Sequence, residues 1–207
     1  RSARLTFPHL RDFRLVRVQD HRRVFAHPHN FLIQQGIIDP STTLRFASLS
    51  VEPALGHQLT AAAFELEGKA AELVQVDMDG KQRQSFVERE QEYQFGIATF
   101  TDIRGEGRRE GVLCLANDDS SIPEETRRKL KVPLVWGWGE RSGLEPAWIY
   151  LRHCILACRK GGEEAERSFL DETFLVDRKT TIRDYLQLHP EVLDSSPPPY
   201  LESRFNG

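Results

Sequence analysis

The chain has 207 residues, of which 39% are hydrophobic, so it can build a buried core as one large domain or two small ones. Its formal net charge of −3 argues against binding to nucleic acid by bulk charge alone. Arg152 and His153 interrupt the most apolar stretch, and the sequence therefore predicts no membrane-spanning helix.

An Arg-rich strand is predicted near the N-terminus. Residues 5–18 alternate apolar residues with arginines, which is typical of a strand with one wet face. The first 30 residues carry seven Arg against two Asp, whereas the C-terminal region is acidic. The basic end indicates a surface that binds nucleic acid or another polyanion, with Arg11, Arg14 and Arg17 as its candidate residues. The alternative is that the two ends neutralise each other.

Three histidines lie within nine residues of one another. His27 and His29 are separated by one proline, and two imidazoles at this spacing in an extended chain can reach one metal ion. His21 or a remote carboxylate would supply a third ligand. His21, His27 and His29 are therefore candidate ligands of a divalent metal, and histidines exposed in a turn are the alternative.

The next stretches predict mostly β-structure. Residues 42–51 alternate apolar and polar side chains as a strand does, whereas residues 53–66 fit a helical and a strand pattern equally well. Residues 70–78 and 83–87 are predicted to pair around Asp79-Gly80, a dipeptide that favours two-residue hairpin turns.

Asp77 and Asp79 also have a chemical interpretation. Together with Lys81 they follow an apolar strand, which resembles the acid-x-acid-x-Lys arrangement of metal-dependent nucleases. In that arrangement carboxylates at a strand end hold Mg²⁺ and the lysine steers a phosphate. Turn chemistry at Asp79-Gly80 is the simpler explanation.

The stretch between Tyr93 and Asn117 carries the strongest β signal of the chain. Residues 93–103 are rich in β-branched and aromatic side chains, and residues 111–117 mirror them across a Gly-x-Gly turn. Because the second arm is apolar at nearly every position, we expect both of its faces to be covered. The sequence predicts a hairpin at the centre of a sheet.

A helix is predicted over residues 121–131, because a serine cap, Pro123 and two glutamates agree with the polarity of a helix N-terminus. Trp136 and Trp138 then alternate with glycines, which places both indoles on one face of a strand over residues 132–139. An exposed aromatic platform for a peptide, sugar or base is one interpretation. Buried tryptophans that pin a sheet are the other.

The last third of the chain mixes element types. Residues 148–159 form a long apolar element, a core strand or a buried helix, and thiols within it are predicted to be buried and inert. Three cysteines without framework spacing are typical of a reducing compartment, so we expect a cytoplasmic or nuclear location. Residues 169–177 predict a strand, and residues 181–190 predict a helix that a capping box opens.

The segment from residue 194 to the end has the composition of a flexible, Pro-rich tail. It contains Pro197-Pro198-Pro199-Tyr200, which resembles the Pro-Pro-x-Tyr ligands of WW domains. Consecutive prolines preform a polyproline II helix, so little conformational entropy is lost on docking, and the tyrosine fills a pocket. Pro197, Pro198 and Tyr200 are therefore candidate partner-binding residues, and a chance match is the alternative.

These patterns predict a β-rich α+β fold with a mostly antiparallel sheet or sandwich and a few short helices. We expect a single domain over residues 1–193, with a sub-boundary near residues 118–132 left open. The favoured function is an intracellular binding or scaffolding domain that recognises a protein or a phosphate-bearing partner. The alternative is a metal-dependent phosphodiesterase or nuclease that uses the three histidines with Asp77 and Asp79. No cofactor beyond such a metal is predicted.

Overall fold

The computed structural model of the chain describes residues 7, 10–66, 75–76, 82–83, 85–90 and 92–207. The strands of this part are β1 (Arg11–Pro28), β2 (Arg45–Glu65), β3 (Gln75–Val76), β4 (Gln82–Arg83), β5 (Gln94–Asp102), β6 (Arg109–Leu115), β7 (Glu145–Pro146) and β8 (Thr173–Phe174). Its α-helices are α2 (Asn30–Gln34), α4 (Phe86–Arg89), α5 (Glu124–Leu130), α6 (Trp148–Gly161), α7 (Glu163–Asp171), α8 (Ile182–Leu188) and α9 (Glu202–Phe205). Short 3-10 helices are η1 (Asp119–Ser121), η2 (Glu140–Ser142), η3 (Pro190–Asp194) and η4 (Pro199–Leu201).

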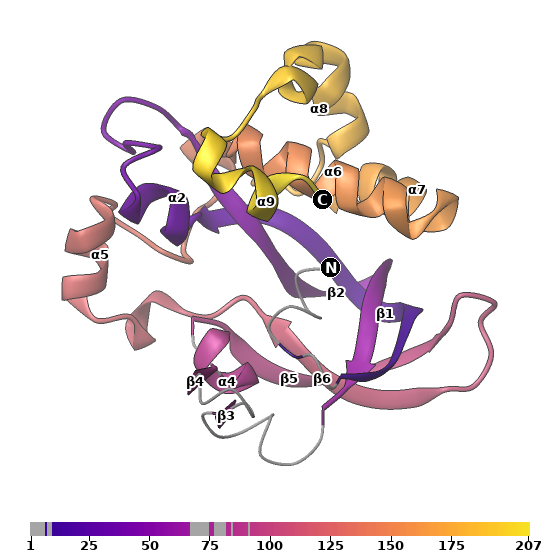
Figure 1. Ribbon diagram of the computed structural model, residues 1–207. Helices are drawn as coiled ribbons and strands as arrows, with labels where there is room; N and C mark the ends of the chain where they lie inside the picture. The colour runs from indigo at the N-terminus through magenta and orange to yellow at the C-terminus, as the bar shows by residue number, and fades with distance from the viewer. Residues whose placement is uncertain (1–6, 8–9, 67–74, 77–81, 84, 91) are drawn as a thin grey trace.

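Two long antiparallel strands, β1 and β2, organise the main sheet (Figure 1). The strand order is β6-β5-β1-β2-β7, with β8 also paired to β1. The two short strands β7 and β8 join in parallel, and the other pairs are antiparallel. This mostly antiparallel sheet with several short helices confirms the predicted β-rich α+β class.

A large bulge divides β1 and β2 into two halves. Gln19 pairs with Gln58 and His21 with Pro53, so four residues of β2 lie opposite one residue of β1. Asp20 and Gly56 both have positive φ at this point, and the Gly56 amide donates to the Asp20 carboxylate at 2.9 Å. The halves on either side of the bulge therefore pack against different parts of the chain.

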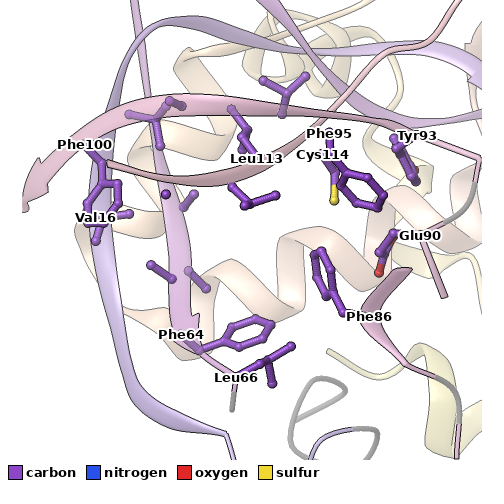
Figure 2. A pocket seen from close by; sticks show the side chains of 18 of the residues that line it. Val16, Phe64, Leu66, Phe86, Glu90, Tyr93, Phe95, Phe100, Leu113 and Cys114 are labelled. Atoms are coloured by element: carbon purple, nitrogen blue, oxygen red, sulfur yellow. The ribbon is translucent and has the colours of Figure 1, made fainter. Parts of the chain in front are cut away.

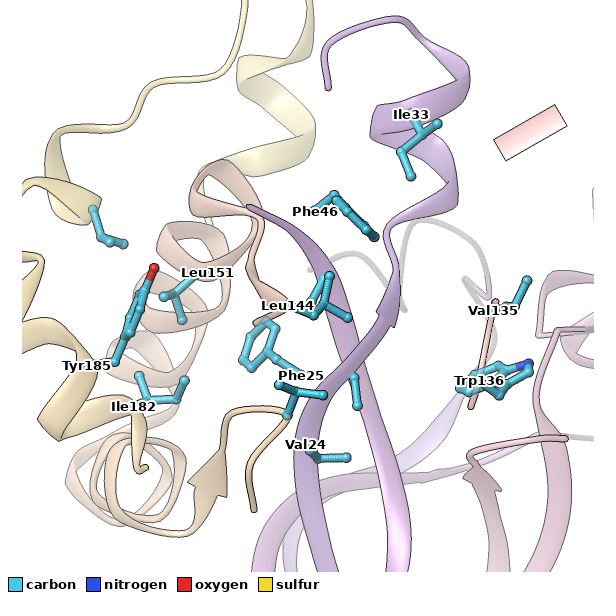
Figure 3. Close-up of a cluster of buried hydrophobic side chains, with 14 of the residues drawn as sticks. Val24, Phe25, Ile33, Phe46, Val135, Trp136, Leu144, Leu151, Ile182 and Tyr185 are labelled. Atoms are coloured by element: carbon cyan, nitrogen blue, oxygen red, sulfur yellow. The ribbon is translucent and has the colours of Figure 1, made fainter. Parts of the chain in front are cut away.

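The larger core lies between the second half of β1, the first half of β2 and the helices α6 and α8 (Figure 3). Many of its side chains are at most 1% exposed, and full burial of each stabilises the fold by about 1.5–3 kcal/mol. They include Val24, Phe25, Phe46, Leu151 and Ile182. A smaller cluster lies on the first half of β1, where Val16 and Val18 meet residues of β2 and β5.

Local signals explain the helices that the sequence predicts. Thr181 and Asp184 form the expected capping box at the start of α8, and two glutamates stand in the first turn of α5. The ambiguous apolar element is the helix α6, in which Leu151 and Ile155 lie four residues apart on the buried face.

The strand predicted over residues 169–177 is wrong for most of its length, because α7 extends to Asp171 and only Thr173–Phe174 pairs as β8. Ala165, Ser168 and Phe169 are buried at helical spacing behind two N-terminal glutamates, a helix signal that precedes the apolar run.

The segment with Trp136 and Trp138 is irregular and not the predicted strand. The carboxylate of Asp119 accepts hydrogen bonds from the backbone amides of Val135, Trp136 and Gly137 at 2.8, 3.1 and 2.6 Å. Three consecutive amides directed at one carboxylate cannot belong to a strand ladder, whose amides alternate in direction. A remote side chain thus decides this backbone conformation.

The predicted hairpin forms as β5 and β6, but its central position in the sheet is wrong. β6 is the last strand of the sheet, and Ile97 and Val112 are 69% and 61% exposed. The apolar strand β6 is therefore covered on one face only. The apolar composition alone does not distinguish a central strand from an edge strand.

Several strand boundaries differ from the expectation. The first strand covers Arg11–Pro28 and not residues 5–18, and the ambiguous residues 53–66 continue the preceding strand to form β2. β3 and β4 pair antiparallel, with Val76 opposite Gln82, and the residues of the predicted turn lie outside the described part. Ser85 caps α4, so the strand predicted over residues 83–87 ends early.

The C-terminal segment packs on the domain, contrary to the linker composition. Leu201 in η4 and Phe205 in α9 are buried with Leu32 and Ala147. The guanidinium of Arg204 lies 3.8 Å from the ring centroid of Phe31. The expectation that the packed core ends before residue 194 is therefore wrong. Every helix in the described ranges is too short or too polar to cross a membrane.

Candidate functional site

An apolar pocket of about 840 Å³ lies on the concave side of β1, β2, β5 and β6 (Figure 2). Aromatic side chains surround it, and Phe86 of α4 is within ring-contact distance of three others, with centroids 5.9–6.5 Å apart. This volume is within the range of pockets that enclose small molecules. The aromatic lining residues are Phe7, Phe64, Phe86, Tyr93, Phe95 and Phe100.

Small side chains on two paired strands leave room for the pocket. Ala61 and Ala63 of β2 lie opposite Val16 and Arg14 of β1, and register partners in a sheet project from the same face. All four residues line the pocket. Protein interiors are normally close-packed, so larger side chains at these two positions would fill the space.

A glycine on β6 positions one wall of the pocket. A Cβ added at Gly111 would lie 2.9 Å from Cε1 of Phe100, closer than real Cβ contacts allow. The Phe100 ring can therefore lie across the backbone of the neighbouring strand. Only glycine at residue 111 permits this placement without moving the ring.

One end of the pocket is closed where β6 reaches β2. The backbone amide of Ala116 donates to the carbonyl of Val51 at 2.7 Å, just beyond the end of β6. The sheet therefore curls around the pocket and brings Val51 and Leu113 onto its lining. This closure makes the pocket a partly closed barrel interior and not an open sheet face.

A buried histidine lies behind the closed end. The hydroxyl of Tyr93, a lining residue, is 3.2 Å from Nε2 of His27 and donates to the carbonyl of Leu49 at 3.3 Å. If Tyr93 donates to Leu49, Nε2 of His27 carries the proton that bonds to the tyrosine. Nδ1 of His27 is then an acceptor, and it has no partner in the described structure.

The imidazole of His27 is held neutral by its surroundings. It is fully buried and stacks on the indole of Trp136 with centroids 4.4 Å apart. Burial and, to a smaller extent, the nearby imidazole of His29 lower the pKa of His27 to about 3. With its pKa lowered this far the ring accepts a proton poorly near neutral pH, and its stacking contact is that of a structural element.

Glu92 lies beside Tyr93 and titrates near neutral pH. Asn30 of α2 donates its side-chain amide to the Glu92 carboxylate. Burial and, to a smaller extent, the negative charge of Glu90 raise the pKa of Glu92 to about 7. The link between α2 and the start of β5 is therefore sensitive to pH.

Charged residues at the pocket carry both signs. Arg14 and Arg109 contribute two positive charges, and Glu65, Glu90 and Glu110 contribute three negative charges. Arg14 also forms an ion pair with Asp12. The pocket therefore has no strong net field that would select an ion of one sign.

The predicted metal ligands are not brought together. No group of three His, Cys, Asp or Glu side chains in the described part of the chain could hold a metal ion. His27 is buried, Nδ1 of His29 accepts from the amide of Leu32 at the start of α2, and His21 bonds to the carbonyl of Gln19. Asp77 and Asp79 lie outside the described residues. The metal-dependent alternative stays a prediction without a described site.

The three candidate arginines do not form one face. Arg14 lines the pocket, whereas Arg17 is an odd number of residues away and projects from the opposite face of β1, where it pairs with Glu164 of α7 at 2.6 Å. Arg11 is exposed at the start of the strand. Binding of a phosphate-bearing partner at these residues stays a prediction.

The two tryptophans do not form a joint exposed platform. Trp136 is buried between His27 and Tyr93. Trp138 is partly buried and packs edge-on against Phe46 with centroids 5.6 Å apart, and its indole N–H donates to the carbonyl of Leu134. Their contacts favour the interpretation that these residues pin the core.

The Pro-Pro-x-Tyr segment is partly exposed in its docked form. Tyr200 is exposed, but Pro197 is buried and residues 199–201 form the 3-10 helix η4. Pro198, with φ −51° and ψ 147°, has the extended conformation that WW domains recognise. Recognition by such a domain would need the segment to leave this conformation, and it stays a prediction.

Burial disfavours ionisation of the two thiols of α6. Burial raises the pKa of Cys154 to about 12 and also raises that of Cys158. A thiolate is therefore scarce at both positions near neutral pH.

Sequence reasoning missed the pocket. Small residues are present in the sequence at 61, 63, 96, 98 and 111, where they indicate only weak strand formers. Strand pairing places all five on the same face of the sheet. Comparisons with protein-family models, with curated proteins and with solved structures found no match to this chain.

Proposed function

We propose that the chain is a binding domain that holds an apolar small molecule in the pocket between β1, β2, β5 and β6. The observation that carries this proposal is a pocket of about 840 Å³ whose floor is built from alanines and whose walls are phenylalanine rings. Proteins rarely leave apolar space of this size without an occupant, because the lining loses dispersion contacts and exposes apolar surface to water. A ligand would restore both.

The chemistry of the lining selects a mostly neutral ligand. Phenylalanine rings offer flat apolar faces, and the charged residues around the pocket carry both signs. The Arg14 and Arg109 guanidinium groups can donate to a ligand carbonyl, and the glutamates of the lining can accept from a ligand hydroxyl. The expected ligand class is therefore a long-chain alcohol, a long-chain ester or a neutral polycyclic molecule.

Binding of Nile red, a neutral dye whose emission shifts in apolar surroundings, tests the proposal. We expect saturable binding to the wild-type protein and displacement by a long-chain alcohol or by pyrene. In the variant Ala61→Phe the new ring would occupy the pocket, and we expect the dye affinity to fall by about tenfold or more. The matched control is Ile97→Phe, which adds a ring on the exposed outer face of β5.

Circular dichroism melting of both variants shows whether each is folded. Binding that both variants weaken equally, or that neither weakens, would contradict a site in this pocket. Dye binding to the wild-type protein that no apolar competitor displaces would also contradict it. If a partner protein covers the pocket, adding that protein should abolish dye binding.

A further inference from the structure

A carboxyl group outside the lining is joined to the closed end of the pocket. Glu90 and Tyr93 line this end (Figure 2), and the backbone amide of Tyr93 donates to the carbonyl of Glu90 at 2.9 Å. Glu92 lies between these two residues in the chain, and its backbone carbonyl accepts from the side-chain amide of Asn117 at 3.4 Å. A change at Glu92 is therefore transmitted through the backbone to two lining residues.

The side chain of Glu92 faces the amide group of Asn30, in the first turn of α2. Nδ2 of Asn30 donates to Oε2 of Glu92. Oδ1 of Asn30 is buried, and no donor among the described residues bonds to it. An ionised carboxylate has no proton to donate, so it would leave this oxygen without a partner and place a negative charge beside it. Burial of an acceptor without a donor destabilises a fold.

A protonated carboxyl group completes the pair. Oδ1 and Nδ2 of Asn30 branch from one carbon atom, as Oε1 and Oε2 of Glu92 do. A neutral Glu92 that accepts from Nδ2 through Oε2 can therefore donate its proton from Oε1 to Oδ1. The result is an acid–amide pair with two hydrogen bonds, in which the buried oxygen of Asn30 has its donor.

The charges around Glu92 favour the same neutral form. From the C-terminal end of α4 the neighbour is Glu90, and at the start of β5 it is Tyr93, whose own pKa is raised by burial and by both glutamates. Asn30 and Asn117, which approach from the other segments, are uncharged. Among the described residues, no Lys, Arg or His side chain forms an ion pair with Glu92. The carboxyl group therefore has like charge near it and no compensating cation.

We propose that Glu92 and Asn30 form a proton-dependent latch on the pocket, so that loss of the Glu92 proton weakens binding of the apolar ligand. This regulation rests on the proposed function of the pocket. Ionised Glu92 is repelled by Glu90 and by Oδ1 of Asn30, and its charge is more stable in water than in the protein interior. As Glu92 turns toward solvent, the segment with Glu90 and Tyr93 moves with it and changes the shape of the closed end. By linkage, a bound ligand holds the proton on Glu92 more tightly.

Nile red titrations at a pH of about 6 and of about 8.5 test the latch, because this interval spans the ionisation of Glu92 and the dye stays neutral throughout. We expect the dissociation constant of the wild-type protein to be about threefold or more larger at the higher pH. In Glu92→Gln a neutral amide pairs with Asn30 at either pH, and we expect the dissociation constant to stay at the wild-type value for the lower pH. The matched control is Glu106→Gln, at an exposed residue between β5 and β6, which should respond to pH as the wild-type protein does.

Infrared spectroscopy detects the carboxyl proton without any ligand. We expect the carbonyl band of a protonated carboxyl group in the wild-type protein and in Glu106→Gln at the lower pH, and its loss at the higher pH and in Glu92→Gln. Absence of this band from the wild-type protein would overturn the latch. A dissociation constant that does not change with pH, or that changes equally in Glu92→Gln, would overturn the latch and leave the proposed function intact. Absence of dye binding to all three proteins at both pH values would overturn the proposed function and the latch together.

Discussion

Protonation of one buried histidine should destabilise the fold in mild acid. His27 is fully buried, its ring stacks on Trp136, and no carboxylate among the described residues is bonded to it. Its pKa is lowered to about 3 by burial, from 6.5 in the unfolded chain. The unfolded state therefore binds a proton more readily than the folded state, and the stability that His27 contributes is present above pH 6.5 and is lost as the pH falls toward 3.

The size of the effect follows from these two pKa values. At a pH of about 5 the imidazole is almost fully protonated in the unfolded chain and neutral in the folded one. Lowering the pH from the unfolded pKa to this value therefore lowers the free energy of unfolding by about 2 kcal/mol. The variant His27→Phe keeps an aromatic ring against Trp136 and removes the proton-binding group. It also removes one hydrogen bond to Tyr93, which keeps its bond to the Leu49 carbonyl.

Urea unfolding followed by circular dichroism measures the difference. The wild-type protein should lose about 2 kcal/mol more than His27→Phe when the pH is lowered from about 7.5 to about 5. Other acid-sensitive groups, such as His29 with a pKa lowered to about 4, contribute to both proteins and cancel in the comparison. Equal losses in the two proteins would refute the reasoning, because they would mean that His27 is protonated in the folded state or exposed to solvent.

Two further predictions concern the link to α2 and the C-terminal segment. The pKa of Glu92 is raised to about 7, so its stabilising effect is present below the unfolded value of 4.5 and is lost as the pH rises through 7. In urea titrations Glu92→Gln should therefore raise the free energy of unfolding by up to about 3 kcal/mol near pH 8 and change it little near pH 5. Phe205→Ala should release α9 and make it susceptible to limited proteolysis with a lower Tm, whereas Tyr200→Ala, at an exposed residue, should leave both unchanged.

Local chemistry in the sequence was sufficient for several elements. The Thr181 to Asp184 capping box starts a helix because both partners lie within one turn, so no distant residue is needed. The two arms that form β5 and β6 are likewise close in the chain and joined by a glycine-containing turn, and they pair as the sequence predicts. The β-rich α+β class follows from the number and spacing of such segments.

Long-range contacts decided what local chemistry left open. Asp119 gathers three amides of the segment with Trp136, and a carboxylate that acts over more than a dozen residues leaves no periodic pattern to read. Leu201 and Phe205 follow a proline-rich run with linker composition, and their burial depends on an apolar surface that Leu32 and Ala147 supply from elsewhere in the chain.

The pocket depends most on tertiary structure. Alanine and glycine residues on β2, β5 and β6 carry little information individually, and only the antiparallel register aligns them on one face. The curl that encloses them is closed by the bond between Ala116 and Val51, two residues far apart in the chain. Sequence alone therefore indicated several of the segments that become strands, among them the hairpin of β5 and β6. The pairing of the strands determined that a ligand-sized space lies between them, because the space is a property of several strands together.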